Sequence, residues 1–250
     1  MRRRRLTSAL FAIPAMAGFL VATIVVGHAS ERRALLELFT SQGCSSCPAA
    51  DKLLGELSAD PTLVALSVPV DYWDYLGWKD TLASPGDSER QRAYAKVRGD
   101  RQVYTPQIVV NGATHVLGSD RAAVERAIAT DQKPGAMSVP IELSINAGAL
   151  DVQVQSAGSE HSAAEVWLCP LAKAVTVAID RGENRGRTIT YHNVVRSWLK
   201  LGDWSGTKAA WSVPLAQFET DGIDAAAVVV QEGGHDRPGL VLGAGYLPLQ

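Results

Sequence analysis

A Cys-x-x-Cys pair between a predicted strand and a predicted helix constrains this chain more than any other feature. Cys44 and Cys47 follow the apolar run 34–39 and precede the helix-like run 49–57. Two intervening residues bring both sulfurs within disulfide range, and a helix N-terminus stabilises a thiolate. Such a pair is typical of thiol redox proteins. The sequence therefore predicts Cys44 as the nucleophile, in water at the helix N-cap, and Cys47 as the resolving thiol.

Other uses of the cysteine pair stay open. A zinc site needs four ligands, and the third cysteine, Cys169, lies 122 residues beyond Cys47 (169 − 47), so no second pair completes one. A permanent structural disulfide is the other alternative in an exported protein. Cys169 sits in the apolar, strand-like run 166–170, where we expect a buried and inert thiol.

The dipeptide Thr105-Pro106 favours exchange chemistry. It opens a predicted strand at 107–110 that turns at Asn111-Gly112 into a second strand, which is the pattern of a β-hairpin. Proline can open a strand but does not sit inside a central one. The placement resembles the cis-proline loop of thioredoxin-fold proteins, which lies against the disulfide. This resemblance implies a cis bond before Pro106, and an ordinary trans proline is the alternative.

The N-terminus has the pattern of an export signal. Met1 and four arginines precede an uncharged, mostly apolar run from Leu6 to Val26, and small residues precede a cleavage point after Ala29. The run of 21 residues (26 − 6 + 1) is also long enough to span a bilayer, so an uncleaved anchor is the alternative. Both interpretations place the rest of the chain outside the cytoplasm, because the arginines stay inside.

The charge balance gives no indication of nucleic-acid binding. Without residues 1–29 the chain carries 20 basic side chains (24 − 4) and 26 acidic ones, a formal charge of −6. A nucleic-acid partner would need a basic face with interspersed aromatic residues.

The remaining chain divides into two halves with different patterns. From Arg33 to about Ala129 the pattern alternates between strand and helix, with a βαβ start followed by a hairpin and a helix. From 137 to 250, alternating apolar residues and Gly-rich turns predict an antiparallel β-sandwich, after a linker at 133–135. The predicted helices lie near 47–58, 87–98 and 120–129. The predicted strands lie at 33–39 and 63–70 and, in the second half, near 139–145, 150–154, 164–169, 174–179, 187–196, 209–213, 226–231 and 239–246.

An aromatic stretch follows the second predicted strand. Residues 71–78 hold four aromatic and two acidic side chains. We interpret the stretch as a platform for a peptide or small ligand near Cys44, with a hydrophobic plug as the alternative. Asp71 is a candidate for proton transfer at Cys47. The candidate substrate-binding residues are Tyr72, Trp73, Tyr75, Trp78 and Tyr104.

Two polar features allow more than one interpretation. His115 is a candidate third ligand of a copper site with Cys44 and Cys47, because thiolates and imidazole suit copper. A surface or hydrogen-bonded histidine is the alternative. The charged segment 180–187 either lines a cleft or forms a solvated turn held by salt bridges.

Several motifs together resemble one family. Residues 37–51 are similar to the signature of a bacterial family of exported thioredoxin-like proteins of unknown function, and 70–78, 104–107 and 181–184 are similar to its other motifs. The resemblance implies a thioredoxin-like domain followed by a β-rich domain, and it implies no established activity. Gly43 stands where thioredoxin has a tryptophan, so the redox potential stays open.

We therefore expect an α/β thioredoxin-like domain (30–132) and a β-rich, sandwich-like domain (137–250) behind an N-terminal segment (1–29). The expected function is that of a periplasmic or secreted thiol–disulfide oxidoreductase or redox-active protein, acting on a protein or small-molecule thiol or disulfide. The alternatives are a copper-binding module and a partner-binding scaffold with a structural disulfide. We expect no cofactor, no nucleic-acid partner, and membrane contact only through an uncleaved N-terminal segment.

Overall fold

A computed structural model of the protein describes residues 32–130, 133–157 and 163–249. The expected export signal at 1–29 lies outside these ranges. Within them, none of the helices combines the length and the apolar character needed to cross a membrane.

The first half is built around a strand that is covered on both faces. β1 (Ala34–Thr40) pairs in parallel with β2 (Leu63–Pro69) and antiparallel with β3 (Gln107–Val110), which continues through a hairpin into β4 (Thr114–Leu117). Every residue of β1 and β2 is buried. Their nearly continuous apolar sequences are what strands buried on both faces require.

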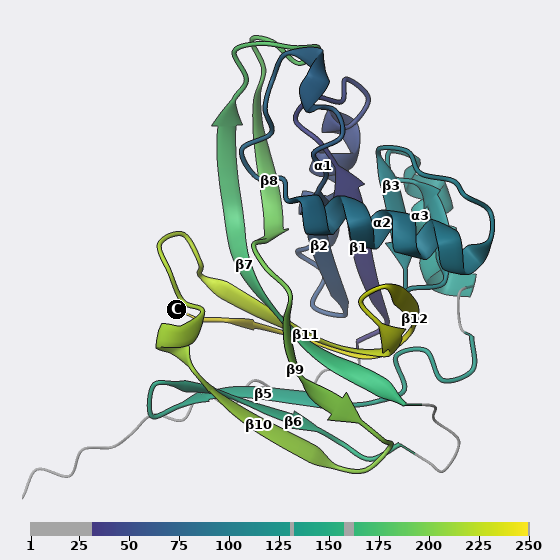
Figure 1. The fold of residues 1–250 in the computed structure, drawn as a ribbon, viewed down its shortest axis with the longest axis vertical. Helices are drawn as coiled ribbons and strands as arrows, with labels where there is room; N and C mark the ends of the chain where they lie inside the picture. Colours follow the sequence, from purple (N-terminus) through teal and green to yellow (C-terminus); the bar gives the residue numbers. More distant parts are fainter. Residues whose placement is uncertain (1–31, 131–132, 158–162, 250) are drawn as a thin grey trace, which may run out of the picture.

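Three α-helices cover these strands (Figure 1). α1 (Pro48–Leu57) and α3 (Arg121–Thr130) pack on one face, and α2 (Pro85–Arg98) packs on the other. Ser84 is the N-cap of α2, and its hydroxyl accepts a hydrogen bond from the Asp87 amide at 3.2 Å. This contact satisfies one of the backbone donors that a helix N-terminus leaves unpaired.

The main sheet continues into the second half of the chain. β7 (Ala164–Ala178), β8 (Thr188–Val195), β11 (Ala225–Gly234) and β12 (Arg237–Pro248) extend it in the order β12-β11-β7-β8-β2-β1-β3-β4. β9 (Leu199–Trp204) pairs with β7, which brings the sheet to nine strands in the described residues. Since β8 lies beside β2, the sheet crosses the expected boundary between the two halves.

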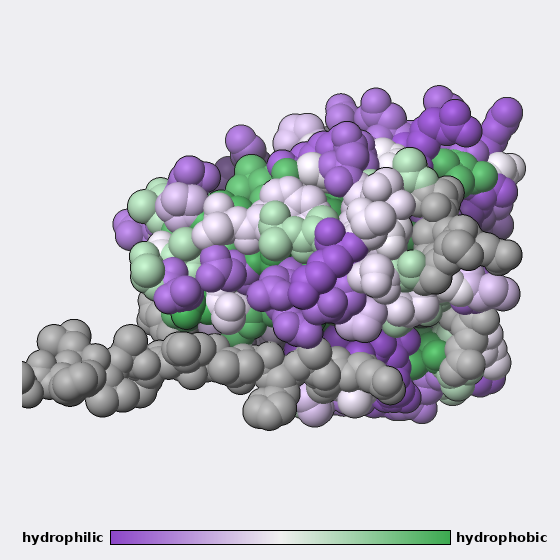
Figure 2. All heavy atoms as spheres, turned by 90° about the horizontal axis from the view of Figure 1, so that it is seen from below, coloured by the Kyte–Doolittle hydropathy of each residue, from purple (hydrophilic) through white to green (hydrophobic). Residues whose placement is uncertain are grey.

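A second, smaller sheet packs on the main one. It contains β5 (Ile141–Asn146), β6 (Ala149–Val154) and β10 (Ala209–Pro214). β5 and β6 meet at Ala147-Gly148, where both φ angles are positive (48° and 78°), as the commonest tight hairpin turns require. Apolar residues of both sheets form one core between them. Figure 2 views this end of the molecule and shows hydrophilic and hydrophobic residues interspersed across the visible face.

Two strands differ from the predicted pattern. The strands expected near 164–169 and 174–179 form one continuous strand, β7, because its first part pairs with β11 and its last part pairs with β8. β9 was not predicted. Its burial does not alternate regularly along the strand, so its sequence lacks the two-residue period of a half-buried strand.

A buried ion pair joins the two halves. Arg90 is 1% exposed and its Nε donates to Oε1 of the fully buried Glu37 at 2.6 Å. The Tyr94 hydroxyl donates to Glu37 Oε2 at 2.5 Å, and Arg90 Nη2 donates to Gln231 Oε1 at 2.8 Å. The guanidinium also lies 4.0 Å from the centre of the Trp198 ring. Because Glu37 lies on β1 and Gln231 on β11, this network fixes the second half of the chain against the first.

Candidate functional site

The cysteine pair lies where β1 ends and α1 begins. Cys44 and Cys47 form a disulfide with their Cα atoms 5.4 Å apart. Cys47 is the N-cap of α1, and Cys44 precedes it in a tight turn. Cys44 is 4% exposed and Cys47 is fully buried. The expectation that Cys44 lies in water at the N-cap is therefore wrong, because Pro48 takes the first helical position and leaves Cys47 as the cap.

The tip of the β7–β8 hairpin covers the cysteine loop. Asn184, at this tip, is fully buried, and its side-chain amide donates to the carbonyls of Gln42 (2.9 Å) and Cys44 (2.8 Å). Glu183 accepts a hydrogen bond from the Ser45 amide at 3.3 Å. Segment 180–187 is thus attached to the cysteine loop through hydrogen bonds, and the described residues show no salt bridge within it.

The aromatic stretch packs against the same loop. Because β2 runs parallel to β1, residues 71–78 leave the sheet at the edge that carries the cysteines. A Cβ on Gly43 would lie 3.0 Å from the Trp73 Cβ, and one on Gly182 would lie 3.1 Å from the Trp78 Cβ. Cβ atoms in proteins rarely approach so closely, so glycine allows the cysteine loop and the hairpin tip to touch the two tryptophans.

The polar atoms of the aromatic stretch are also engaged. Trp78 Nε1 donates to Gln42 Oε1 at 2.7 Å, next to the cysteines. The Tyr72 hydroxyl donates to Gln91 Oε1 at 3.0 Å. Tyr75 is 76% exposed and stacks on Trp73 with 6.1 Å between ring centres. Tyr75 therefore presents the free aromatic surface of this stretch.

Thr105-Pro106 lies at the same edge of the sheet. The peptide bond between the two residues is cis, so that prediction is confirmed. Trp73 Nε1 donates to Thr105 Oγ1 at 2.7 Å. A Cβ on Gly118 would lie 3.3 Å from the Cβ atoms of both Pro106 and Ala50. The structure thus brings this dipeptide to α1, one turn after Cys47.

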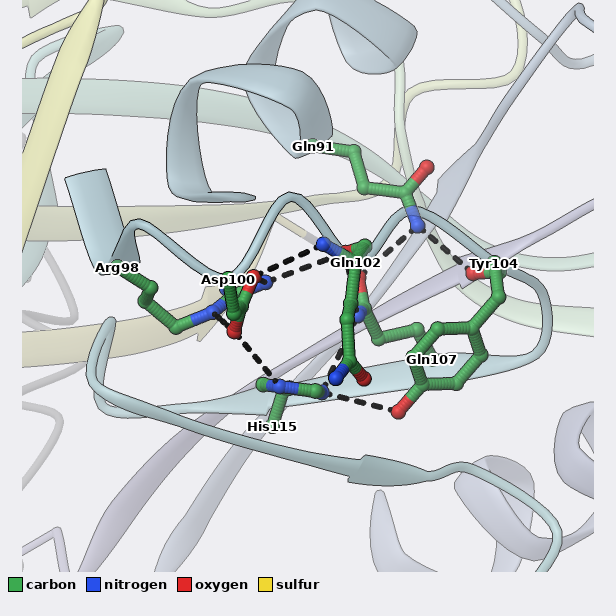
Figure 3. A network of polar contacts seen from close by, with 7 residues as sticks. All are labelled: Gln91, Arg98, Asp100, Gln102, Tyr104, Gln107 and His115. Atoms are coloured by element: carbon green, nitrogen blue, oxygen red, sulfur yellow. Dashed lines mark hydrogen bonds and ion pairs between the residues drawn. The ribbon is translucent and has the colours of Figure 1, made fainter. Parts of the chain in front are cut away.

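A polar network holds the segment before Thr105 (Figure 3). His115 Nδ1 lies 3.0 Å from the Tyr104 hydroxyl, and His115 Nε2 lies 3.1 Å from Asp100 Oδ2. Gln91 Nε2 donates to the Tyr104 carbonyl at 2.8 Å and to Gln107 Oε1 at 2.9 Å. Burial lowers the pKa of His115, and the positive charge of a nearby arginine lowers it further.

The structure does not join His115 to the cysteines as a metal site. Both ring nitrogens of His115 already have partners. Across the described ranges, His, Cys, Asp and Glu side chains form no group of three that could hold a metal ion.

Asp51 is a buried acid that the sequence did not single out. It is 2% exposed and lies one helical turn after Cys47, and Thr40 Oγ1 donates to Asp51 Oδ1 at 2.7 Å. Asp51 Oδ2 is buried without a hydrogen-bond partner among the described residues. Burial raises the pKa of Asp51 to about 8, although the bond from Thr40 opposes this shift, and the nearby Asp80 adds to it. The spacing of four residues from Cys47 was the available signal.

Asp71, the acid that the sequence suggested for proton transfer, bonds to a different element. Its carboxylate accepts a hydrogen bond from the Ser88 hydroxyl in α2 at 2.6 Å. Asp80, by contrast, is 4% exposed and accepts the Gln42 amide at 2.7 Å. Burial raises the pKa of Asp80.

Two more buried polar atoms lack partners in this part of the molecule. The hydroxyl of Tyr191 and Oδ1 of Asn184 are both buried and unpaired within the part of the chain that the structure describes. Burial raises the pKa of Tyr191, and the charges of Asp51 and Asp80 raise it further. Asn184 is the one that contacts the cysteine loop, through the carbonyls of Gln42 and Cys44. Buried unpaired polar atoms cost about 1–3 kcal/mol each and are rare in folded proteins. The unpaired atoms of Asn184, at the cysteine loop, and of Asp51, one turn after Cys47, mark this region as the candidate site.

Cys169 lies apart from this site. It is a free, fully buried cysteine on β7, as predicted. Burial raises its pKa far above the ordinary value of a thiol.

Comparison with known proteins identifies the family of the chain. Residues 35–231 match the family described as a protein of unknown function, DUF1223, and the chain belongs to this family. A search of curated proteins found no match. The chain is similar to the crystal structure of a protein from Agrobacterium tumefaciens, a structural genomics target. The two are 30% identical with a TM-score of 0.78, and the match covers 88% of this chain and 96% of that one.

Proposed function

We propose that this member of the DUF1223 family is an exported thiol–disulfide oxidoreductase that uses Cys44 and Cys47. The observation that carries the proposal is the disulfide at the start of α1 with the buried Asp51 carboxyl one turn further along the helix. The strand order β2-β1-β3-β4, with helices on both faces, supports a thioredoxin-like unit around this pair. The N-terminal pattern of arginines and apolar residues supports export.

The proposed reaction exchanges one disulfide for another. In the reducing direction, the Cys44 thiolate attacks one sulfur of a substrate disulfide, forms a mixed disulfide and releases the first substrate thiolate. The Cys47 thiolate then attacks the Cys44 sulfur, restores the Cys44–Cys47 bond and releases the second substrate thiolate. Two electrons and two protons pass from the protein dithiol to the substrate. The reverse sequence oxidises a substrate dithiol, and the reduction potential decides the direction.

Asp51 replaces Asp71 as our candidate for proton transfer at Cys47. When the disulfide opens, Cys47 leaves as a thiolate in a buried position that disfavours charge. With a pKa of about 8, the Asp51 carboxyl is protonated at pH 7 and can give its proton to that sulfur. Residues four apart share one face of a helix, so the carboxyl and the Cys47 sulfur lie on the same side of α1.

A redox titration tests this function. The folded, oxidised protein is equilibrated with dithiothreitol buffers of stepped potential, exchange is stopped with acid, and the thiols are counted by alkylation after the protein is unfolded. We expect a reversible two-electron transition that a Cys44→Ser variant lacks and a Cys169→Ala control keeps. We also expect the wild-type protein to catalyse insulin reduction. A disulfide that stays closed at every potential in the folded protein would refute the function.

A partner-binding scaffold with a structural disulfide is the second candidate. The 4% exposure of Cys44 and the bonds from Asn184 favour it, because a covered disulfide resists exchange. The same titration separates the two functions. A structural disulfide would open only together with global unfolding, and replacing both cysteines would then prevent folding.

A further inference from the structure

A groove of about 620 Å³ lies between α1 and β8, at the start of the helix that follows the disulfide. Pro48, which directly follows Cys47, forms one end of it, and Arg187 comes from the hairpin tip that covers Cys44. The Arg187 amide donates to the Asn184 carbonyl at 3.1 Å, which ties this side of the groove to the cover. The groove therefore adjoins the cysteine loop at Pro48 and the cover of that loop at Arg187.

The groove is positively charged. Lys52 and Arg187 line it, and neither has an ion pair with any described residue. Among the described residues that line it, the one acid is Glu56, which forms an ion pair with Arg121 outside the groove. The whole chain carries a formal charge of −2, so this local excess of positive charge runs against the overall balance. Two unpaired cations in a concave site attract an anionic ligand.

The dimensions of the site favour a small ligand. A groove of about 620 Å³ lies within the range of about 300–1,000 Å³ that is usual for small-molecule sites. Cys44 is 4% exposed beneath the hairpin tip, and a protein surface cannot approach it without moving that tip. A small thiol held in the groove needs far less room.

We propose that this groove binds the carboxylates of a small anionic thiol, or of its disulfide, and brings its sulfur to the Cys44–Cys47 pair. This inference rests on the proposed exchange function and names its substrate class. The thiolate of the bound molecule attacks the Cys44 sulfur, the Cys44–Cys47 bond breaks, and Cys47 leaves as a thiolate. A second molecule of the thiol then attacks the sulfur of the first, which releases the Cys44 thiolate and a small-molecule disulfide.

Binding is tested apart from the redox chemistry. S-methylglutathione carries two carboxylates and no free thiol, and its binding to the oxidised protein is measured by calorimetry at two salt concentrations. We expect saturable binding that weakens in high salt and that falls roughly threefold in Lys52→Gln and in Arg187→Gln, as the loss of one exposed ion pair predicts. Arg185→Gln is the matched control, because Arg185 is exposed in the same turn and does not line the groove.

Exchange rates test the delivery of the sulfur. The reduced protein is mixed with oxidised glutathione (anionic), bis(2-hydroxyethyl) disulfide (neutral) or cystamine (cationic). Each rate for Lys52→Gln and Arg187→Gln is compared with the Arg185→Gln rate for the same disulfide. We expect both groove variants to slow the reaction with oxidised glutathione roughly threefold. The rate with the neutral disulfide should stay the same, and the rate with cystamine should rise slightly.

The two experiments separate the inference from the proposed function. In one outcome the protein exchanges with the neutral disulfide, but it does not bind S-methylglutathione and the groove variants have no effect. This outcome would refute ligand binding in the groove and leave the proposed oxidoreductase function intact. Binding without any exchange would overturn the oxidoreductase and, with it, the delivery of a substrate sulfur. Binding that is equally strong in all three variants would also overturn the groove, because the anion would then lie elsewhere.

Discussion

The buried carboxyl of Asp51 makes the stability of this protein depend on pH in a direction that is unusual for an acid. Most aspartates gain stability on ionisation, because their charged form is paired in the folded state. Burial instead raises the pKa of Asp51 from 3.8 to about 8, so the folded protein holds a proton that the unfolded chain loses. Since stability falls with rising pH wherever the folded state binds more protons, we expect a loss of stability between about pH 4 and pH 8.

The size of this loss follows from the two pKa values. They differ by about 4 (8 − 3.8), and each pH unit corresponds to about 1.4 kcal/mol. Full ionisation of Asp51 therefore costs on the order of 5 kcal/mol. Within a range that is simple to measure, from pH 5.5 to 7.5, the expected loss is about 2–3 kcal/mol.

Urea unfolding of the wild-type and Asp51→Asn proteins at several pH values measures this loss. Asparagine keeps the shape and removes the titration, so the free energy of unfolding of the variant minus that of wild type should increase across the range and level off near pH 8. A Thr40→Val variant loses the one hydrogen bond that lowers the pKa of Asp51. The pH at which the stability of this variant stops falling should therefore be higher than in wild type. A difference between wild type and Asp51→Asn that stays flat from pH 5 to pH 9 would refute the reasoning.

Three further predictions concern contacts described above. Asn184→Ala removes both hydrogen bonds that its side chain donates to the cysteine loop. In a thiol-release assay, dithiothreitol should then open the disulfide severalfold faster. An unchanged rate would show that the hairpin tip does not protect the disulfide. Glu37→Gln leaves the buried charge of Arg90 uncompensated, which should lower the free energy of unfolding by about 3–5 kcal/mol, and a loss below about 1 kcal/mol would contradict this. Gly43→Ala places a Cβ 3.0 Å from that of Trp73 and should cost about 1–3 kcal/mol in the same assay, whereas full stability would mean that the loop can shift freely.

Short sequence patterns predicted most of the helices and strands of the first half. The Asn-Gly turn and the run of apolar residues in β1 and β2 act over short distances, so single segments reveal them. The position of Cys47 at the N-cap was also available, because proline favours the first helical position and Pro48 follows Cys47.

The features that the sequence did not predict depend on contacts between segments far apart in the chain. Pairing of β2 with β8 joins Ser67 to Val194, and no local pattern reports such a partner. Asn184 belongs to a segment as polar as any exposed turn, and it becomes buried only because the hairpin folds over a loop 140 residues away. The buried state of Asp51 has the same origin, since Asp80 and Tyr191 reach it from other elements.

The covering hairpin also gives the order of chain assembly a chemical consequence. β7 and β8 are made after all the strands and helices of the first half, so in a growing chain the two cysteines are made well before their cover. During that interval we expect both thiols to meet oxidants and alkylating agents freely, and the arrival of the hairpin then ends this exposure. A thiol reagent added to reduced chains that end before β7 and to the reduced full chain tests this. We expect it to label the cysteines of the shortened chains faster, and equal protection in both would contradict this order. A disulfide catalyst present at this stage would therefore act on the cysteines of this chain before it has finished folding.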